Sequence, residues 1–321
     1  MPRGRSRSRG AFWQSEAVPE YPDLELYLSA LAPRVMGKPL ERVRLGSPFV
    51  LRSVEPPLSG TFGKMIIALR RLGKRRIFEF EGELFIVIHL MIAGRLQWKP
   101  AGAKLAARAG LAAFDFPDGT LLLTEVSTKK RASIHVASGE AALRTFDRGG
   151  LDPMHAHLDD FATRARLENH TLKRTLTDPR LFAGIGNAYS DEILHRAKLS
   201  PVKQTKTLTG EELSRLFDAT RSVLSEWLQR LRSETGDEWP EKVTAFRPEM
   251  AVHGKHKQPC PVCGSPVQRI VHADNETNYC ARCQTGGKLL ADRSLSRLLK
   301  EDWPSTLEEL EEYVASRGTA Q

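Results

Sequence analysis

The strongest constraint on the fold is the arrangement of the four cysteines, which are the only cysteines in the 321 residues of the chain. They form two Cys-x-x-Cys pairs with sixteen residues between them. Each pair can direct two thiolates to one point, and two pairs together give the tetrahedral sulfur shell that a structural Zn²⁺ prefers. Redox dithiols or two disulfides are alternatives, but neither explains both the pairing and the spacing. The predicted ligands of one structural zinc, in a ribbon over residues 250–287, are Cys260, Cys263, Cys280 and Cys283.

The chain is basic, with 48 Lys and Arg against 39 Asp and Glu and a formal net charge of +9. The region around the predicted ribbon, residues 250–300, holds eight Lys or Arg and three acids. This excess favours a polyanionic partner such as nucleic acid. No apolar run approaches the roughly eighteen residues that a membrane helix needs, so we expect no membrane span. Reduced cysteines fit a cytoplasmic protein, and the charge suggests association with the nucleoid.

The two ends of the chain differ in charge. Residues 1–18 begin with ten residues that are rich in arginine and contain no acid and no apolar core. This composition predicts a flexible basic extension and excludes a secretory signal peptide. Residues 288–321 form a C-terminal tail that is acidic from residue 301.

Residues 19–148 carry the pattern of a β-rich domain with a leading helix. The apolar spacing of Leu24, Leu28 and Leu31 predicts a helix that begins near Pro22 and ends before Pro33. Period-two alternation then predicts strands, because short apolar runs are punctuated by Gly and Pro and no helical crossovers lie between them. The expected strands lie near residues 43–45, 77–80, 84–90, 121–126 and 134–136. The pattern favours a β-sandwich or barrel.

Residues 149–245 read as a helical domain. Thr209 and Glu212 form a capping box ahead of a long amphipathic helix. Gly184-Ile-Gly-Asn187 predicts a turn in which Asn187 caps a helix whose first turn carries Asp191 and Glu192. Such a turn can offer backbone N–H groups to a phosphate, although an ordinary cap explains Asn187 equally well. The predicted fold class is therefore α+β and multidomain.

The run from Gly184 to Glu192, the preceding Lys173 and the ribbon ending in Cys283-Gln284 together resemble the formamidopyrimidine-DNA glycosylase and endonuclease VIII family. The stretch from Pro19 to Glu25 is similar to the opening motif of that family. The resemblance covers about residues 19–290. It implies an N-terminal β-sandwich, a helix-two-turns-helix domain and a C-terminal zinc finger, with a monomer binding damaged double-stranded DNA in the cleft between the first two.

The activity that the resemblance implies is base-excision repair by a DNA glycosylase with AP lyase activity. The enzyme would remove oxidised bases, such as formamidopyrimidine or 8-oxoguanine. In this family an N-terminal proline attacks C1′ of the flipped-out nucleotide and forms an imine that permits strand scission. Pro19 matches that proline, Glu20 matches the acid that handles protons at the sugar, and Lys74 matches a lysine of the catalytic domain.

The resemblance also implies DNA contacts, some of which are altered here. Lys173 and Asn187 match residues that hold phosphates. The usual Gly-Arg of the finger is replaced by Asp274-Asn275, so Arg282 or Asn275 is the expected substitute.

Two further positions depart from the family pattern near the expected DNA. The segment from His89 to Gly94 resembles the strand that fills the gap left by the flipped base, with Ile92 where methionine is typical. The expected Arg-Phe pair is replaced by Lys129-Lys-Arg-Ala132, which makes Lys130 and Arg131 the predicted DNA contacts of that loop.

The position of Pro19 creates a conflict, because a proline within a chain is a tertiary amide without a nucleophilic nitrogen. Initiation at Val18 followed by removal of the initiator methionine, or an equivalent processing event, would expose the amine of Pro19. Pro2 is a competing terminus, but it lies in the flexible arm. The alternative function is a catalytically silent protein of the same fold that binds damaged DNA.

Overall fold

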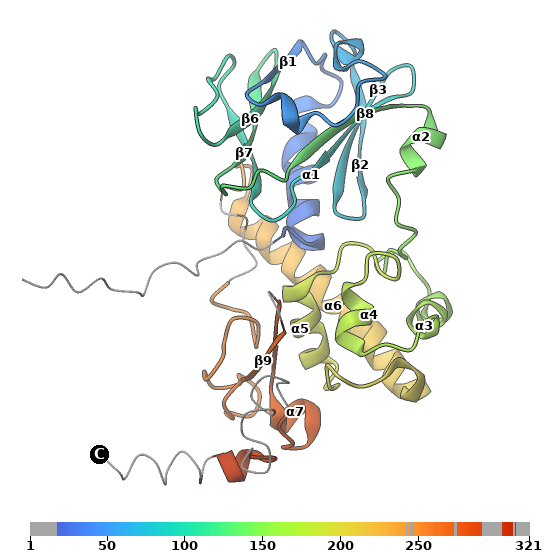
Figure 1. The fold of residues 1–321 in the computed structure, drawn as a ribbon, viewed down its shortest axis with the longest axis vertical. Helices are drawn as coiled ribbons and strands as arrows, with labels where there is room; N and C mark the ends of the chain where they lie inside the picture. The colour runs from blue at the N-terminus through green and yellow to red at the C-terminus, as the bar shows by residue number, and fades with distance from the viewer. Residues whose placement is uncertain are drawn as a thin grey trace, which may run out of the picture.

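The computed structural model describes residues 18–241, 243, 247–272, 275–290, 304–310 and 312. Apart from Val18, the predicted basic extension lies outside the described residues, as does most of the predicted acidic tail. Figure 1 shows a β-rich domain, a helical domain beside it and a small C-terminal module with a β-hairpin. This arrangement confirms the predicted multidomain α+β architecture. No helix in the described ranges is long and apolar enough to cross a membrane.

The first helix, α1 (Tyr21–Val35), runs along the β-rich domain and into the helical domain. The Glu20 N–H donates to Asp23 Oδ2 at 3.1 Å, which satisfies one backbone donor at the helix start. The prediction that the helix ends before Pro33 was wrong. Pro33 has no N–H and so leaves one helical hydrogen bond unmade, but the burial of Leu31 and Val35, both 0% exposed, stabilises the last turn of the helix.

Two four-stranded antiparallel sheets form the predicted sandwich. The first sheet has the order β1 (Arg42–Leu45), β6 (Gly110–Phe116), β7 (Gly119–Glu125) and β5 (Gly94–Lys99). The second has the order β2 (Ile66–Leu72), β3 (Arg75–Phe80), β4 (Leu84–His89) and β8 (Ser133–Ser138). Two 3₁₀ turns, η1 (Pro48–Val50) and η2 (Leu58–Thr61), connect β1 to β2. The sheets pack through apolar side chains such as Phe78 and Phe114, whose ring centroids lie 6.0 Å apart.

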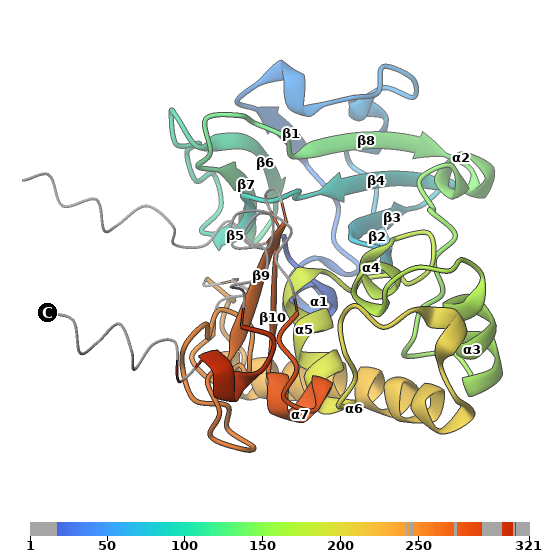
Figure 2. The same ribbon diagram turned by 60° about the horizontal axis from the view of Figure 1, so that its bottom comes forward.

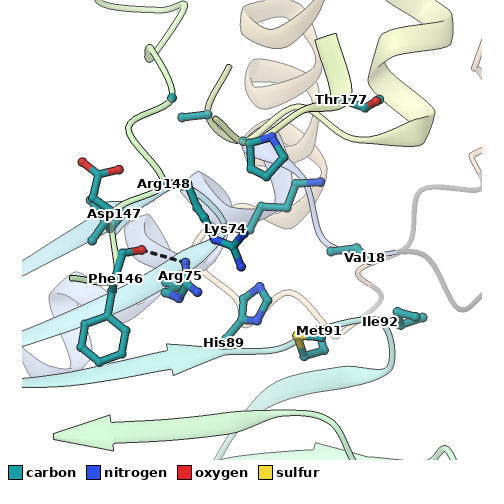
Figure 3. A pocket seen from close by; sticks show the side chains of 16 residues that line it. Val18, Lys74, Arg75, His89, Met91, Ile92, Phe146, Asp147, Arg148 and Thr177 are labelled. Atoms are coloured by element: carbon teal, nitrogen blue, oxygen red, sulfur yellow. Dashed lines mark hydrogen bonds between the residues drawn. The ribbon is translucent and has the colours of Figure 1, made fainter. Parts of the chain in front are cut away.

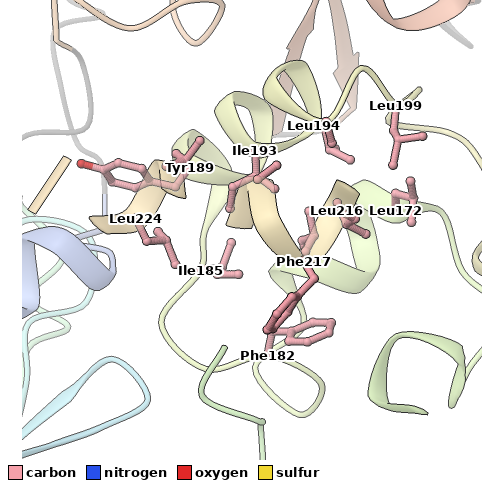
Figure 4. Packing of buried hydrophobic residues seen from close by; sticks show 14 of the residues in the cluster. Leu172, Phe182, Ile185, Tyr189, Ile193, Leu194, Leu199, Leu216, Phe217 and Leu224 are labelled. Atoms are coloured by element: carbon pink, nitrogen blue, oxygen red, sulfur yellow. The ribbon is translucent and has the colours of Figure 1, made fainter. Parts of the chain in front are cut away.

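The helical domain follows the short helix α2 (Glu140–Arg144) and a linker. Its elements are α3 (Leu158–Arg166), α4 (Leu172–Thr177), α5 (Asn187–Arg196), the 3₁₀ turn η3 (Thr205–Thr207) and α6 (Gly210–Thr235). Phe161 packs against both Phe182 and Phe217, with centroid distances of 4.6 and 5.3 Å, and Figure 4 shows the apolar side chains that α5 and α6 add to this core.

The capping box of α6 is confirmed. The Glu212 N–H donates to Thr209 Oγ1 at 3.2 Å, and the Thr209 N–H donates to Glu212 Oε2 at 3.0 Å. The C-terminal module contains β9 (Gln268–His272) paired antiparallel with β10 (Asn275–Tyr279), followed by α7 (Ala281–Thr285). Figure 2 shows this hairpin rising beside α5 toward the sandwich.

Candidate active site and zinc centre

The Glu20 carboxylate lies at the N-terminus of α5. It accepts hydrogen bonds from the backbone N–H groups of Gly186 at 2.7 Å, Ala188 at 2.9 Å and Tyr189 at 3.1 Å. The first N–H groups of a helix have no partner within the helix, and they attract negative charge. Glu20 is only 2% exposed. The glycine-containing turn therefore binds a carboxylate from the opening motif, and these three donors are already used.

This arrangement corrects two predictions about α5. The N-cap is Gly186, and Asn187 is the first residue of the helix. Asp191 and Glu192 lie beyond the first turn, which contains no acid. The physical reason is that Glu20 supplies from outside the helix the negative charge that the local sequence seemed to supply from within it.

Lys74 lies beside Glu20. A Cβ atom placed on Gly186 would lie 2.5 Å from Glu20 Cδ and 2.6 Å from Lys74 Nζ, so both side chains occupy the space that the glycine leaves open. Burial lowers the pKa of Lys74, and the charges of Glu20 and Asp23 oppose that change. Lys74 follows Gly73, whose φ of +59° forms the turn between β2 and β3.

Pro19 is buried next to Glu20, and Val18 lines an adjoining cavity of about 270 Å³. The cavity lies between the two domains, bounded by the β2–β3 turn, the segment after β4, the linker at residues 146–150 and residues 177–184. Figure 3 shows Lys74, His89 and Arg148 around it. The charged residues of the lining are Lys74, Arg75 and Arg148 against Asp147, and this excess of positive charge suits a phosphate or another anion.

His89 contributes an uncharged side chain to that wall. Burial, together with the positive charges of Arg75, Arg76 and Lys74, lowers its pKa to about 4. The imidazole is therefore neutral near pH 7 and can donate one hydrogen bond. The sequence reasoning placed His89 in a gap-filling strand. In the structure β4 ends at His89, and a turn follows in which Met91 has a φ of +53°.

The structure brings together the two predicted phosphate-binding residues. Lys173 Nζ donates to the backbone oxygen of Asn187 and to Asp191 Oδ1, both at 2.6 Å. Asp191 is buried and also contacts His253 Nδ1 at 2.8 Å and the Asn278 N–H at 3.2 Å. Lys173 is 13% exposed at its side chain, so this lysine lies at the edge of the protein surface with its ammonium group already paired.

The other predicted DNA contacts lie apart from this pair. Lys130 and Arg131 are exposed on the loop between β7 and β8. Glu125 holds that loop by accepting the N–H groups of Arg131 at 2.8 Å and Ala132 at 3.0 Å. Arg282 is exposed on α7, which Figures 1 and 2 place at the end of the hairpin away from the sandwich.

Of the two residues that replace the usual Gly-Arg of the finger, the structure describes only Asn275. Asp274 lies outside the described residues. Asn275 begins β10, where its backbone pairs with His272.

The four cysteines form a group that fits zinc. Their sulfur atoms all lie within 4.8 Å of one another, with Cys260 Sγ 3.9 Å from Cys283 Sγ and Cys263 Sγ 3.4 Å from Cys280 Sγ. A tetrahedral Zn–S₄ shell with bonds of about 2.3 Å has sulfur–sulfur separations of about 3.8 Å. All four thiols are free of disulfides. The group is the site of one structural zinc.

Three family models match the chain. The formamidopyrimidine-DNA glycosylase N-terminal domain matches residues 18–185, its H2TH domain matches residues 150–237, and the zinc finger found in FPG and IleRS matches residues 257–286. The chain belongs to the formamidopyrimidine-DNA glycosylase family.

Individual members of the family are similar over most of their length. The formamidopyrimidine-DNA glycosylase of Heliobacterium modesticaldum is 32% identical, over 83% of this chain and 100% of its own. The crystal structure of the MutM (Fpg) protein of Thermus thermophilus has a TM-score of 0.69 at 30% identity, covering 83% of this chain and 98% of that one. A complex of Lactococcus lactis Fpg with abasic-site DNA has a TM-score of 0.73 at 25% identity, covering 83% and 99%.

Sequence reasoning missed the cavity residue Arg148 and also Arg247, which supports the site of this glycosylase from outside the opening motif. Arg247 Nη2 lies 3.1 Å from Asp23 Oδ1, while Asp23 Oδ2 accepts the N–H of Glu20. Burial raises the pKa of Asp23, and Arg247 opposes that change. Arg247 therefore supports the Pro-Glu motif from a segment 224 residues away. No local motif marks Arg247, so only the folded chain could reveal it.

Proposed function

We propose that this DNA glycosylase of base-excision repair removes oxidised bases, such as formamidopyrimidine or 8-oxoguanine, and cleaves the resulting abasic strand through a Schiff base on Pro19. It would act as a monomer on double-stranded DNA of the nucleoid. The observation that carries the proposal is the fixed Glu20 carboxylate beside Pro19, at an interdomain cavity with a basic wall. Because the chain belongs to the formamidopyrimidine-DNA glycosylase family, we infer that the cavity receives a flipped-out nucleotide.

The proposed chemistry requires a free amine at Pro19. An α-amino group has a pKa near 8, so a useful fraction is neutral at cellular pH. The nitrogen lone pair attacks C1′, and the glycosidic bond breaks with its electron pair going to the base, which takes up the proton that the amine loses. The C1′–O4′ bond then opens while Glu20, which has taken up a proton from solvent, gives it to O4′, and an iminium remains between Pro19 and C1′. The Glu20 carboxylate regenerated in this step can accept the C2′ proton, and the resulting elimination expels the 3′ phosphate and cleaves the strand.

The basic residues have a separate role in this proposal. Lys74, His89 and Arg148 line the cavity in which the backbone of the flipped nucleotide would lie. Lys173 and Asn187 would hold a neighbouring phosphate, and Lys130 and Arg131 would contact the duplex from the opposite domain. Arg282 is the proposed contact of the finger. Phosphate contacts of this kind position the protein and carry no sequence information.

The decisive experiment compares two forms of the protein on a duplex with one abasic site. One form begins at Pro19, and the other retains residues 1–18 and is confirmed intact by mass spectrometry. Borohydride reduces an imine to a stable protein–DNA adduct, so the form that begins at Pro19 should be trapped and the longer form should not. Pro19→Gly in the shorter form should lose most of the adduct. Excision from duplexes with 8-oxoguanine or formamidopyrimidine tests the lesion range.

The trapping results distinguish Pro19 from other nucleophiles and an active enzyme from a catalytically silent protein. Equal trapping of both forms would exclude Pro19 as the required nucleophile and move the assignment to Lys74 or Pro2. Failure of both forms to trap or cleave, with tight binding to the abasic duplex retained, would support the alternative of a silent damaged-DNA-binding protein.

A further inference from the structure

Helix α5 contacts the zinc finger along its length. The Glu192 carboxylate accepts the N–H groups of Ala251 at 2.7 Å and of Val252 and His253 at 2.9 Å. Just beyond the C-terminal end of α5, Gln284 Nε2 donates to the backbone oxygen of Leu199 at 2.9 Å. These contacts bind the finger to the helix, but none of them touches a zinc ligand through a side chain of the helix.

One contact does reach a ligand. His195 on α5 places Nε2 3.3 Å from Cys260 Sγ. Both residues are buried, with His195 6% and Cys260 2% exposed, so water does not compete for this contact. The two residues lie 65 positions apart, in different domains of the chain.

The direction of this hydrogen bond follows from the chemistry of the zinc site. A thiolate bound to zinc carries no proton, so Cys260 can only accept and His195 must hold its proton on Nε2. Donation to sulfur withdraws electron density from the thiolate and stabilises it as an anion. Groups outside the ligand shell that bond to a ligand in this way fix its orientation and tune the metal.

The other thiols obtain support from within the finger. The Cys283 N–H, for example, lies 3.5 Å from Cys280 Sγ, at the N-terminus of α7. Support of that kind forms whenever the finger folds. The His195 contact forms only when the finger is docked on α5.

We propose that His195 is a positioning residue of the zinc centre, which retains the metal by donating a hydrogen bond from the helical domain to the Cys260 thiolate. Zinc retention thereby depends on docking of the finger against α5. Since the N-terminus of the same helix holds Glu20, one helix connects the metal centre to the candidate active site.

The test measures zinc release from the full chain into an excess of a zinc-binding dye. His195→Phe keeps an aromatic ring but removes the donor, and His195→Asn removes the ring but has an amide too short to replace Nε2. His195→Gln can place an amide N–H near the position of Nε2. The matched control is Arg196→Gln, which changes the next residue of the helix, whose guanidinium pairs with the exposed Glu226 at 2.8 Å.

We expect the Phe and Asn variants to release zinc at least about tenfold faster than the parent, as is typical for loss of such a hydrogen bond. The Gln and Arg196→Gln variants should release it at nearly the parental rate. With Co²⁺ in place of zinc, the sulfur-to-metal charge-transfer band should shift to lower energy in the Phe and Asn variants and return toward the parental position in the Gln variant.

Two results would overturn the proposal. Parental release rates in both the Phe and the Asn variants would show that the contact does not retain the metal. Equally fast release from the Gln variant, without recovery of the cobalt band, would assign His195 to packing. If one loss variant does not fold, the other decides the outcome together with the cobalt spectrum.

Discussion

The Gly186 N–H donates a hydrogen bond to Glu20 Oε2 at 2.7 Å across 166 residues of chain. The contact joins the opening motif to the helical domain, and it depends on the absence of a side chain at Gly186. The backbone of Gly186 is extended, with a φ of −136°, so the glycine is required for space and not for its conformation.

Gly186→Ala should therefore reduce excision without unfolding the protein. The added Cβ would lie 2.5 Å from Glu20 Cδ and would displace the carboxylate. A misplacement of about 1 Å costs roughly 100-fold in rate, and single-turnover excision on an 8-oxoguanine duplex should show a loss of that size. Gly210→Ala is the matched control, because a Cβ there meets nothing within 4 Å. An unaltered rate for Gly186→Ala would separate Glu20 from the chemistry.

Arg247→Met should destabilise the folded protein strongly. Asp23 is fully buried, and the substitution removes the cation that lies 3.1 Å from it. Loss of one partner of a buried ion pair costs about 3–5 kcal/mol, which urea unfolding can measure. Arg230→Met provides the comparison, since its 4.0 Å contact with Glu234 is exposed and should be worth less than about 1 kcal/mol. Similar losses for the two variants would contradict the role of Arg247.

The parts of this molecule that depend on contacts between residues near in sequence were predictable, whereas the parts that depend on contacts between distant segments were not. The zinc ligands were predictable because each Cys-x-x-Cys pair is local, and Thr209 and Glu212 lie within one helical turn. Strand β6 was missed because it is buried on both faces and lacks period-two alternation. Strand β2 was missed because Arg70 and Arg71 interrupt its apolar pattern and a bulge lies between Ile66 and Ala68.

Within the candidate site, the resemblance singled out Glu20, Lys74 and Lys173 as site residues, but the sequence could not show which groups contact them. The donors to Glu20 come from backbone groups of α5, which no side-chain pattern records. The assignment of Asn187 as the cap failed for the same reason.

His89 should make stability depend on pH in a defined window. Its pKa is about 4 in the folded protein against 6.5 ordinarily, so between these values the unfolded chain binds a proton that the folded chain does not. The contribution is complete above pH 6.5 and is lost progressively as the pH falls toward 4. In urea unfolding at a series of pH values, His89→Gln should flatten the curve in this window. Parallel curves for His89→Gln and the parent would refute the assignment.

Lys173→Ala and Asn187→Ala should weaken binding about equally for damaged and undamaged duplex, but salt should separate them. Loss of a charged phosphate contact reduces the slope of log affinity against log salt by about one unit, whereas loss of a neutral contact leaves it nearly unchanged. The structure sharpens the test, because Lys173 is paired with Asp191 in the absence of DNA. An unaltered slope for Lys173→Ala, measured by fluorescence anisotropy, would mean that this lysine stays with Asp191 and has a structural role.

Because the position of Glu20 depends on backbone groups of residues 186–189, an incomplete chain that lacks these residues cannot hold the Glu20 carboxylate in place. During synthesis, the sandwich up to β8 leaves the ribosome well before α5 does, and it then carries the opening motif without the N–H groups that hold its acid. The same is true of a fragment cut by a protease within the linker at residues 146–150. We expect nascent chains and such fragments to be inert toward DNA, so that the proposed strand cleavage would begin only in molecules whose two domains have already docked.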